Sequence, residues 1–367
     1  MSRFFSTVGA PEYIQSPVLY ERRPVTQLWS RLTAVTKQQW KWKNFAYKDD
    51  PEFMQCPKRQ LQIYGPPGSG KSSATFYWVQ HVCHTCPTKA YWISCAAENE
   101  KCWSIEGTPG GGGGIPAASP SDTPHTAEAM LDATVLVFDG IRAKNVEKWR
   151  GMITELARKG IAVVVVSSEG VRFHDGDSQD IMKLENFLPS WSLEEYQAAY
   201  RDDNFWRSCY DQFDGGTSGD SVHQRELLIG NKFTVAGHSA RFMFKKVEYS
   251  IEQTIRRDAR AMGGIDSLEK ALPNMYASGA INTLLARLQD DKNGTTPQHP
   301  AEFPTAEDLT GAGVTRADFA LLEAEKDHED AQPRLVSAFA SDEVDGFGTS
   351  VLAAPGGQNR LFRPFYL

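Results

Sequence analysis

The sequence lacks any hydrophobic run long enough to cross a lipid bilayer. Its longest purely aliphatic run covers only residues 161–166, whereas a spanning helix needs about 20 apolar residues. The opening stretch, MSRFFSTVGAPEYIQ, also lacks the apolar centre that a secretory signal peptide needs. We therefore expect no membrane span and no simple secretory export.

The sequence also lacks an excess of positive charge and a regular cysteine pattern. Its 39 Lys and Arg residues are outnumbered by 46 Asp and Glu residues, which gives a net charge of −7. That balance argues against a protein that coats nucleic acid by bulk charge, but it does not exclude a local basic groove. The 6 cysteines follow no disulfide-framework spacing, so a reducing compartment, the cytoplasm or the nucleus, is expected.

Strand-like and helix-like patterns alternate from residue 61 onward. They are LQIYG, a helix over about 71–85, AYWISC, VLVFDG, a helix over about 144–159, and IAVVVVSS, with IMKLENFLP as a fifth strand. Continuous β-branched runs between helices are typical of a parallel sheet covered on both faces. The expected fold class is therefore α/β, with a parallel sheet covered by helices on both faces.

Changes of pattern divide the 367 residues into four expected segments. They are an N-terminal flanking segment at 1–55, the α/β core at 56–189, a helical or winged lid subdomain at 190–290, and a C-terminal segment of unassigned role at 291–367. Within the core, TPGGGGGIPAASPSDTP at 108–124 has a Gly and Pro density that no strand or helix is expected to tolerate. It is predicted to be a disordered surface insertion.

The strongest chemical signal is GPPGSGKSS, which fits the phosphate-loop pattern G-x-x-x-x-G-K-[ST] between an expected strand and an expected helix. Glycines let backbone N–H groups wrap a phosphate, and the helix N-terminus adds its positive end. We expect Lys71 to reach the β and γ phosphates and the Ser72 hydroxyl to bind Mg²⁺. The predicted nucleotide-binding residues are Gly65, Pro66, Pro67, Gly68, Ser69, Gly70, Lys71, Ser72 and Ser73.

A second buried strand, VLVFD, ends in Asp139. In P-loop enzymes an acid at the tip of such a strand holds magnesium through water, and we expect that role for Asp139. The alternative is an acid that only caps a turn. Gly140 stands where many related ATPases carry a water-activating Glu. Hydrolysis is therefore expected to be slow, or the catalytic base comes from elsewhere.

The strand IAVVVVSS supplies two further candidates and a third lies just beyond it. A strand between the phosphate-loop strand and the Asp139 strand would lie beside the γ-phosphate, so the hydroxyl of Ser167 or Ser168 would sense it. A strand end with Ser in the turn is the other interpretation. Glu169 is a candidate replacement base.

Three arginines are candidates for phosphate contacts. Arg241, in VAGHSARFMF, lies in the lid, from which its guanidinium would reach the γ-phosphate and couple nucleotide state to lid position. Arg142 and Arg172 lie near strand ends and would face the phosphates of a neighbouring subunit. Solvated surface cations are the alternative for these two.

The stretch LWSRLTAVTKQQWKWKNF mixes aromatic and basic residues. Such residues stack on single-stranded nucleic acid and neutralise it, but an aromatic helix docked on the core has the same composition. Docking is favoured. The residues concerned are Trp29, Trp40, Trp42, Lys37, Lys41 and Lys43.

The segment from His81 to Cys86 has the spacing of a metal site, with His81, Cys83, His84 and Cys86. A second C-x-x-C pair is missing, although zinc needs four converging ligands. The segment also falls on the helix after the phosphate loop, whose inner face must pack on the sheet. Buried free thiols are therefore the favoured interpretation.

Five segments occur in a telling combination: GPPGSGKSS, VLVFDGI, AVVVVSSEG, LPSWSLEEYQAAYRDDNFW and KFTVAGHSARFMF. Together they resemble the P-loop NTPase module of the Crinkler and retrotransposon-hot-spot type effector family, which is related to STAND and AAA-like ATPases. The first two segments are generic, whereas SW-x-LEEY followed by K-F-x-V-x-G-x-S-A-R is more discriminating. The resemblance covers about residues 58–250.

The resemblance implies nucleotide-driven switching of the lid, with Arg241 at the position of the family's lid arginine. Family members commonly join this module to a nuclease-like or kinase-like toxin domain and act in the nucleus of a host cell. No such motif follows residue 250 and no delivery header is recognisable, so the chain resembles a truncated or regulatory member. A true effector would be secreted and delivered to the host nucleus, with a host or self protein as partner.

The expected function is an ATP-binding, Mg²⁺-dependent P-loop NTPase that acts as a nucleotide-driven switch with slow ATP hydrolysis. No motif determines which nucleotide base is bound, so GTP is an alternative to ATP. No motif determines the oligomeric state either. One alternative is a non-hydrolysing, nucleotide-gated interaction module, for which Gly140 is the supporting residue. The other is an AAA-like ATPase that acts on nucleic acid through WKWKNF.

Overall fold

The computed structural model describes residues 4–5, 10–11, 14, 19–44, 58–85, 88–95, 100–107, 116–121, 128–142, 145–167, 171, 181–262, 285–288 and 332–335. These residues form two compact units. The first unit contains the residues up to Tyr64 together with 71–188. The second contains Gly65–Gly70 and the described residues from Pro189 onward.

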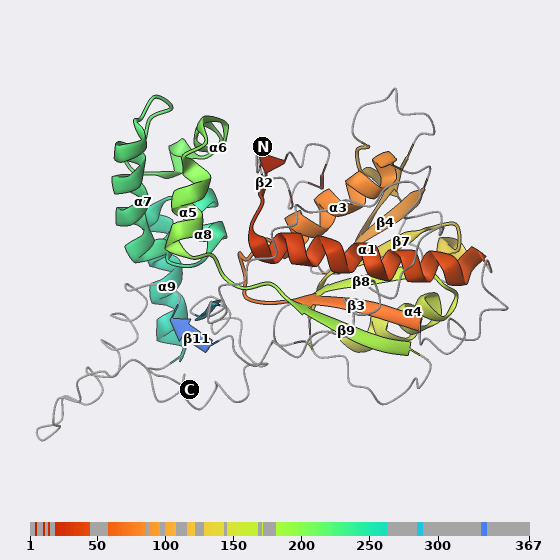
Figure 1. Cartoon of the computed structure of the whole chain (residues 1–367). Helices are drawn as coiled ribbons and strands as arrows, with labels where there is room; N and C mark the ends of the chain where they lie inside the picture. The colour runs from red at the N-terminus through yellow and green to blue at the C-terminus, as the bar shows by residue number, and fades with distance from the viewer. Residues whose placement is uncertain are drawn as a thin grey trace, which may run out of the picture. The chain divides into compact units, whose positions relative to one another are not determined.

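The first unit is built on a seven-stranded sheet with the spatial order β6-β5-β4-β7-β8-β3-β9 (Figure 1). In chain order the strands are β3 (Lys58–Tyr64), β4 (Lys89–Ser94), β5 (Lys101–Glu106), β6 (Ser119–Ser121), β7 (Val135–Ile141), β8 (Ala162–Ser167) and β9 (Ile181–Phe187). A two-residue pair, β1 (Phe4–Phe5) with β2 (Leu19–Tyr20), belongs to the same unit. The α/β class predicted from the sequence is confirmed.

The sheet is mixed, not purely parallel. Strands β4, β7, β8, β3 and β9 run parallel to their neighbours, as the alternating pattern predicts. Strands β5 and β6 add to the β4 edge in antiparallel orientation. The prediction of a parallel sheet is wrong at this edge because a short connection after β4 folds the chain back on itself, which parallel pairing forbids.

The predicted insertion at 108–124 contains part of that edge. Residues 119–121 form β6, with Pro120 opposite Trp103 of β5. A proline lacks the N–H that a central strand must donate, but an outermost strand leaves one row of donors unpaired in any case. The expectation that this segment contains no strand is therefore wrong for 119–121, and residues 108–115 and 122–124 lie outside the described residues.

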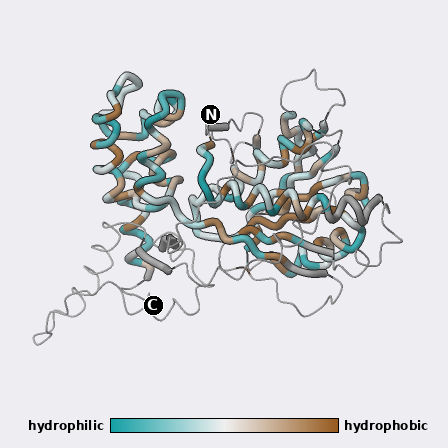
Figure 2. The backbone as a smooth tube through the Cα atoms, in the orientation of Figure 1, coloured by the Kyte–Doolittle hydropathy of each residue, from teal (hydrophilic) through white to brown (hydrophobic). Residues whose placement is uncertain are grey.

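Helices cover both faces of the sheet, as predicted (Figure 1). α1 (Arg23–Asn44) and α3 (Lys71–Thr85) pack on one face, and α4 (Val146–Arg158) packs on the other, where a short 3-10 helix, η1 (Glu128–Met130), precedes β7. The alternating residues of β7 and β8 supply both faces, with Val137 and Val164 on one and Phe138 and Val165 on the other. Figure 2 shows these central strands as a continuous hydrophobic layer.

Helix α1 docks on the core through its aromatic residues. Trp29 is fully buried, and its indole N–H donates to the carbonyl of Ala74 in α3 at 2.9 Å. Lys37 is buried too. The docking interpretation is thus confirmed for Trp29, which cannot stack on nucleic acid, whereas the side chains of residues 38–44 lie outside the described residues.

The second unit is mainly helical. Its helices are α5 (Leu193–Tyr200), α6 (Asp203–Arg207), the 3-10 helix η2 (Tyr210–Gln212), α7 (Val222–Ala236), α8 (Ala240–Lys245) and α9 (Glu248–Met262). α5 begins with a reciprocal capping box between Ser192 and Glu195. Helical pattern was expected to about residue 289, but Leu285–Leu288 form β10, antiparallel to β11 (Gln332–Leu335).

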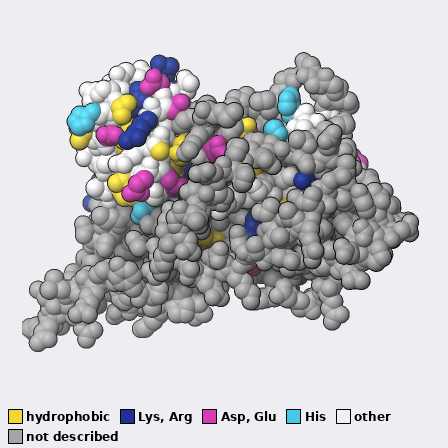
Figure 3. Space-filling view, in the orientation of Figure 1, with side chains coloured by type: hydrophobic (Ala, Val, Ile, Leu, Met, Phe, Trp, Pro, Cys, Tyr) yellow, Lys and Arg dark blue, Asp and Glu magenta, His cyan; other side chains and the backbone are white. Residues whose placement is uncertain are grey.

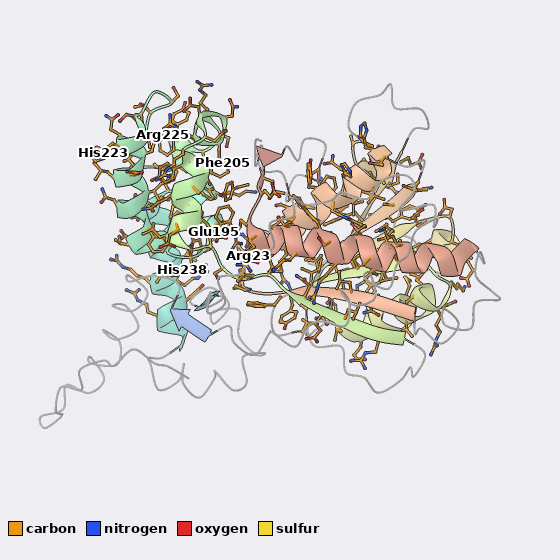
Figure 4. The ribbon with its side chains drawn as sticks, in the orientation of Figure 1. Arg23, Glu195, Phe205, His223, Arg225 and His238 are labelled. Atoms are coloured by element: carbon orange, nitrogen blue, oxygen red, sulfur yellow. The ribbon has the colours of Figure 1, made fainter. Side chains whose placement is uncertain are left out.

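Aromatic residues from both discriminating segments form the core of this unit. Trp191 stacks on Tyr196 at 5.1 Å between ring centroids, and Phe244 meets the edge of both rings. The ring Nδ1 of His238 lies 2.7 Å from the Trp191 carbonyl oxygen, and the Trp191 N–H donates to the His238 carbonyl at 3.2 Å. Figure 4 shows Glu195, Phe205 and His238 in this unit. The SW-x-LEEY segment and the segment ending in HSAR therefore hold each other in place.

Arg225 joins three helices of the second unit, α5, α6 and α7, and the turn before α7. It is buried on α7 and donates to the carbonyls of Asp220 and Tyr200 and to the carboxylate of Asp203, at 2.8, 3.1 and 2.7 Å. Figure 4 shows it between α7 and α5. The described surface of this unit carries charges of both signs among isolated hydrophobic residues (Figure 3). Among the described residues of both units, we find no helix with the length and apolarity that a membrane crossing requires.

Lys232 gives the second unit a predictable pH dependence. It is fully buried on α7, donates to the Gln212 carbonyl and lies over the Phe213 ring. Burial lowers the pKa of Lys232 from 10.5 to about 8. Between these two pH values the folded chain binds fewer protons than the unfolded chain, so stability rises with pH by up to about 3 kcal/mol.

We expect Lys232→Met to remove that rise. Urea unfolding of the full chain, followed by circular dichroism between pH 7 and pH 10.5, would measure it. Above pH 8 the free energy of unfolding of the wild type should increase relative to that of the variant. Parallel curves for the two chains would contradict the assignment.

Candidate phosphate-binding site

The segment Gly65–Gly70 connects β3 to α3, and α3 begins at Lys71, as the phosphate-loop pattern predicts. Gly65, Gly68 and Gly70 have φ angles of 145°, 79° and 94°. Residues with a side chain rarely adopt such angles. Pro66 accepts a hydrogen bond from the Ser69 N–H at 3.4 Å, which closes the turn. Glycines at these spacings are thus required by the backbone itself.

Ser72 and Asp139 lie side by side. The Ser72 hydroxyl, in the first turn of α3, donates to Oδ1 of Asp139 at 2.9 Å. Asp139 lies near the carboxyl end of β7 and is only 3% exposed. The structure therefore brings together the two residues that were predicted separately to hold magnesium.

The chemistry of this pair fits Mg²⁺. Hydroxyl and carboxylate oxygens are ligands that Mg²⁺ prefers, and the ion usually takes its remaining ligands from water and substrate phosphates. Among the described residues there is no group of three His, Cys, Asp or Glu side chains that could hold a metal ion by protein ligands alone. An ion at Ser72 and Asp139 would take its remaining ligands from water and phosphate.

Gly140 explains why no acid follows Asp139. It lies at a register shift between β7 and β8 and has a φ of 80°. A glutamate at this position would have to adopt the left-handed backbone region, which costs about 1–3 kcal/mol. The bulge turns the chain immediately after Asp139, so the sequence position after this acid favours glycine.

Within the second unit, the loop lies against the start of α8. A Cβ added to Gly68 would meet the Ser239 hydroxyl at 2.5 Å and the Arg241 backbone nitrogen at 3.1 Å. The close approach therefore needs glycine for space as well as for conformation. Arg241, predicted as the lid arginine, belongs to the segment that touches the phosphate loop.

Arg241 and Lys245 are exposed residues one helical turn apart on α8. Partial burial, and then the charge of Arg241, lower the pKa of Lys245. Residues at i and i+4 lie on the same face of a helix. The two cations thus form one basic face on α8, and Lys245 is a residue that motif reasoning missed.

The other predicted phosphate contacts have different positions. The Ser167 hydroxyl is buried at the end of β8 and accepts from Nε2 of Gln62 at 2.9 Å, so it is engaged within the sheet. β8 does lie between β3 and β7, as expected. Arg142 is exposed. Ser168, Glu169 and Arg172 lie outside the described residues.

The His and Cys residues of α3 show the properties of packed side chains. Cys83 is fully buried, and its thiol lies 3.5 Å from the Ile105 carbonyl oxygen. Burial, and then His84, lower the pKa of His81 to about 4. The buried free-thiol interpretation is confirmed for Cys83, and Cys86 lies outside the described residues.

A second group of polar side chains lies at the same end of the strands as Asp139. It contains Cys95, Glu100, Asn145 and Lys148. Lys148 of α4 pairs with the carboxylate of Glu100, whose side chain is 18% exposed. No motif marks these residues in the sequence, because their proximity results from the antiparallel pairing of β5 with β4.

No protein-family model and no curated protein matches the chain.

Proposed function

We propose that this protein is a Mg²⁺-dependent P-loop NTPase that binds ATP. The observation that carries the proposal is the hydrogen bond between Ser72 and Asp139, directly after a loop with three left-handed glycines. A turn with accidental glycines has no reason to place a hydroxyl against a buried carboxylate on a different strand. In P-loop NTPases a Ser or Thr after the loop and an Asp at the end of a neighbouring strand hold the magnesium ion of the nucleotide.

In the proposed mechanism each residue has a separate task. Backbone N–H groups of residues 65–70 and the N-terminus of α3 bind the phosphates. Lys71 would donate to the β and γ phosphates, and Ser72 and Asp139 would hold Mg²⁺. When bound, the ion would supply positive charge against the phosphoryl group that is transferred. In this mechanism the rate acceleration comes from binding energy and positioning of the phosphates, and no covalent intermediate with the protein is formed.

We also propose that nucleotide state is read by the second unit. Gly68 of the phosphate loop contacts the segment Ser239–Arg241, which the aromatic core around Trp191 and His238 holds. A phosphate on this loop would thus lie near the basic face of α8. Such a switch accords with the Crinkler-type resemblance of the SW-x-LEEY and HSAR segments, and a host or self protein would be its partner.

Two other functions compete with slow hydrolysis. The left-handed bulge at Gly140, which excludes the usual Glu, favours a non-hydrolysing nucleotide-gated module. An ATPase that acts on nucleic acid would do so through WKWKNF, whose side chains lie outside the described residues. Titration of the pure chain with ATP, GTP and ADP, with and without Mg²⁺, and turnover with and without single-stranded DNA would separate the three. Absence of nucleotide binding would refute all of them.

We expect Arg241→Ala to abolish the difference between ATP and ADP in the second unit. Only a contact that ATP makes and ADP lacks shifts a lid equilibrium, and one charge-assisted hydrogen bond corresponds to about a tenfold to hundredfold preference. Hydrogen exchange over residues 191–245 should then be equal for the two nucleotides, while ADP affinity stays unchanged.

Arg201→Ala provides the matched control for this experiment. Arg201 is exposed in the same unit and forms a surface ion pair with Glu226. This variant should keep the ATP-specific protection. Equal protection by ATP and ADP in the wild-type chain would refute the lid switch and favour a static binding module.

A further inference from the structure

The backbone register places Glu100 at the end of the sheet where Asp139 lies. Asp139 of β7 is the partner of Ser94 in β4, and Ser94 is the partner of Lys101 in β5. Adjacent strands lie about 4.8 Å apart. Glu100 directly precedes Lys101, so it lies two strands from Asp139, at the same end of the sheet.

Cys95 connects Glu100 with Asp139. Its N–H donates to the Asp139 carbonyl at 2.7 Å. After burial, the charges of Asp139 and then Glu100 are the causes that raise the pKa of this thiol. Both carboxylates therefore lie close to one buried side chain, which itself stays protonated and takes no part in chemistry.

The surroundings hold Glu100 in a fixed position. Lys148 of α4 forms an ion pair with its carboxylate. Asn145, just before α4, donates to the Cys95 carbonyl at 2.6 Å and accepts from the Arg142 N–H at 2.8 Å. These bonds fasten the start of α4 to the end of β4, so the carboxylate is oriented by two packed elements.

We propose that Glu100 is the catalytic base of the NTPase reaction and that Lys148 positions it. This inference rests on the proposed function. Gly140 removes the usual acid from the residue after Asp139, and Glu100 is an acid that approaches the same edge from the neighbouring strand pair. The ion pair with Lys148 holds the carboxylate in one orientation.

In the proposed step, the oxygen of a water molecule forms a bond to the γ-phosphorus while the bond from that phosphorus to the β–γ bridging oxygen breaks. The electron pair of the broken bond stays on the oxygen of ADP. The water proton passes to the Glu100 carboxylate and from there to the released phosphate. No oxidant or further co-reactant is needed.

The test compares Glu100→Gln with Glu106→Gln. Glu106 lies at the other end of β5 and forms an ion pair with Lys89 at 3.3 Å, so it matches Glu100 in residue type and pairing but lies at the opposite sheet edge. We expect Glu100→Gln to lower kcat for MgATP about 100-fold or more, with the Kd for MgATP changed less than threefold. Glu106→Gln should leave both values close to those of the wild type.

Lys148 is tested by rescue, because a residue that acts through another should tolerate a like charge. Lys148→Met should lower kcat about tenfold and Lys148→Arg should restore most of it. A structural role alone would lower the melting temperature in proportion to the loss of activity. Equal melting temperatures with unequal kcat values are therefore the expected result.

The outcomes separate this inference from the proposed function. If Glu100→Gln binds and hydrolyses MgATP like the wild type, Glu100 is not the base, but the NTPase assignment stands. If the wild type binds MgATP without turnover, the base assignment also fails and the nucleotide-gated module is favoured. If the wild type binds no nucleotide, the proposed function itself fails.

Discussion

Lys71→Ala is expected to abolish tight binding of ATP while the fold stays intact. Lys71 is the first residue of α3, directly after the phosphate loop, where its ammonium group reaches the β and γ phosphates in the proposed mechanism. Each hydrogen bond to a charged group contributes about 1.5–3 kcal/mol. Loss of two such bonds weakens binding about 100-fold or more. Calorimetric titration with MgATP measures the effect.

The control for this variant is Lys159→Ala, which removes the same charge from the end of α4. Lys159 pairs with Glu155 and Glu128 at 2.8 and 3.3 Å on the surface. Substitutions at exposed positions usually change stability by less than about 0.5 kcal/mol, so Lys159→Ala should melt close to the wild type, and a thermal melt of Lys71→Ala checks that its fold is kept. If Lys71→Ala binds MgATP as tightly as Lys159→Ala does, the phosphate-loop assignment is wrong.

Local sequence patterns predicted the parts of the site that the backbone dictates locally. The glycine spacing of the loop predicts left-handed residues before a helix, and the structure has them at Gly65, Gly68 and Gly70. A β-branched run that ends in an acid predicts a buried strand with Asp139 near its tip. The capping box at Ser192 is equally local. Each of these features depends on residues within one turn or one strand.

Features that depend on pairing between distant segments were not predictable in this way. β5 carries no motif, and its antiparallel register with β4 decides that Glu100 and not Glu106 lies at the end near Asp139. The contact of Gly68 with Ser239 likewise joins residues far apart in the chain. A strong Gly and Pro bias also concealed β6, because an edge strand tolerates Pro120.

The discriminating segments gain a physical explanation from the second unit. Trp191 and Tyr196 pack with Phe244, and His238 bonds to Trp191. These residues are a packing core, and the segment that they hold includes Ser239 and Arg241, which lie against Gly68 of the loop. The sequence alone shows the combination of segments but not which of their residues pack together.

Asp139→Asn is expected to separate metal-dependent from metal-independent nucleotide binding. The amide has the same size and still accepts the hydrogen bond from Ser72, so the packing at the end of β7 is kept. The negative charge that faces the ion is lost. Mutation of a residue that contacts a ligand of the metal, rather than the metal itself, typically lowers metal affinity or activity about 10- to 100-fold. We expect that loss in MgATP affinity or turnover, with ATP binding in EDTA nearly unchanged.

Asp132→Asn is the control for Asp139→Asn, because Asp132 precedes the other end of β7 and pairs with Lys89 at 2.9 Å. It makes the same chemical change at the opposite sheet edge, so it should leave the Mg²⁺ dependence of binding unaltered. Titrations with and without Mg²⁺ and a thermal melt of each variant complete the comparison. An equal loss of binding with and without Mg²⁺, together with a lower melting temperature, would contradict this expectation and make Asp139 a structural residue. The reason is that removal of a buried charged acceptor destabilises the end of β7 whether or not the ion is bound.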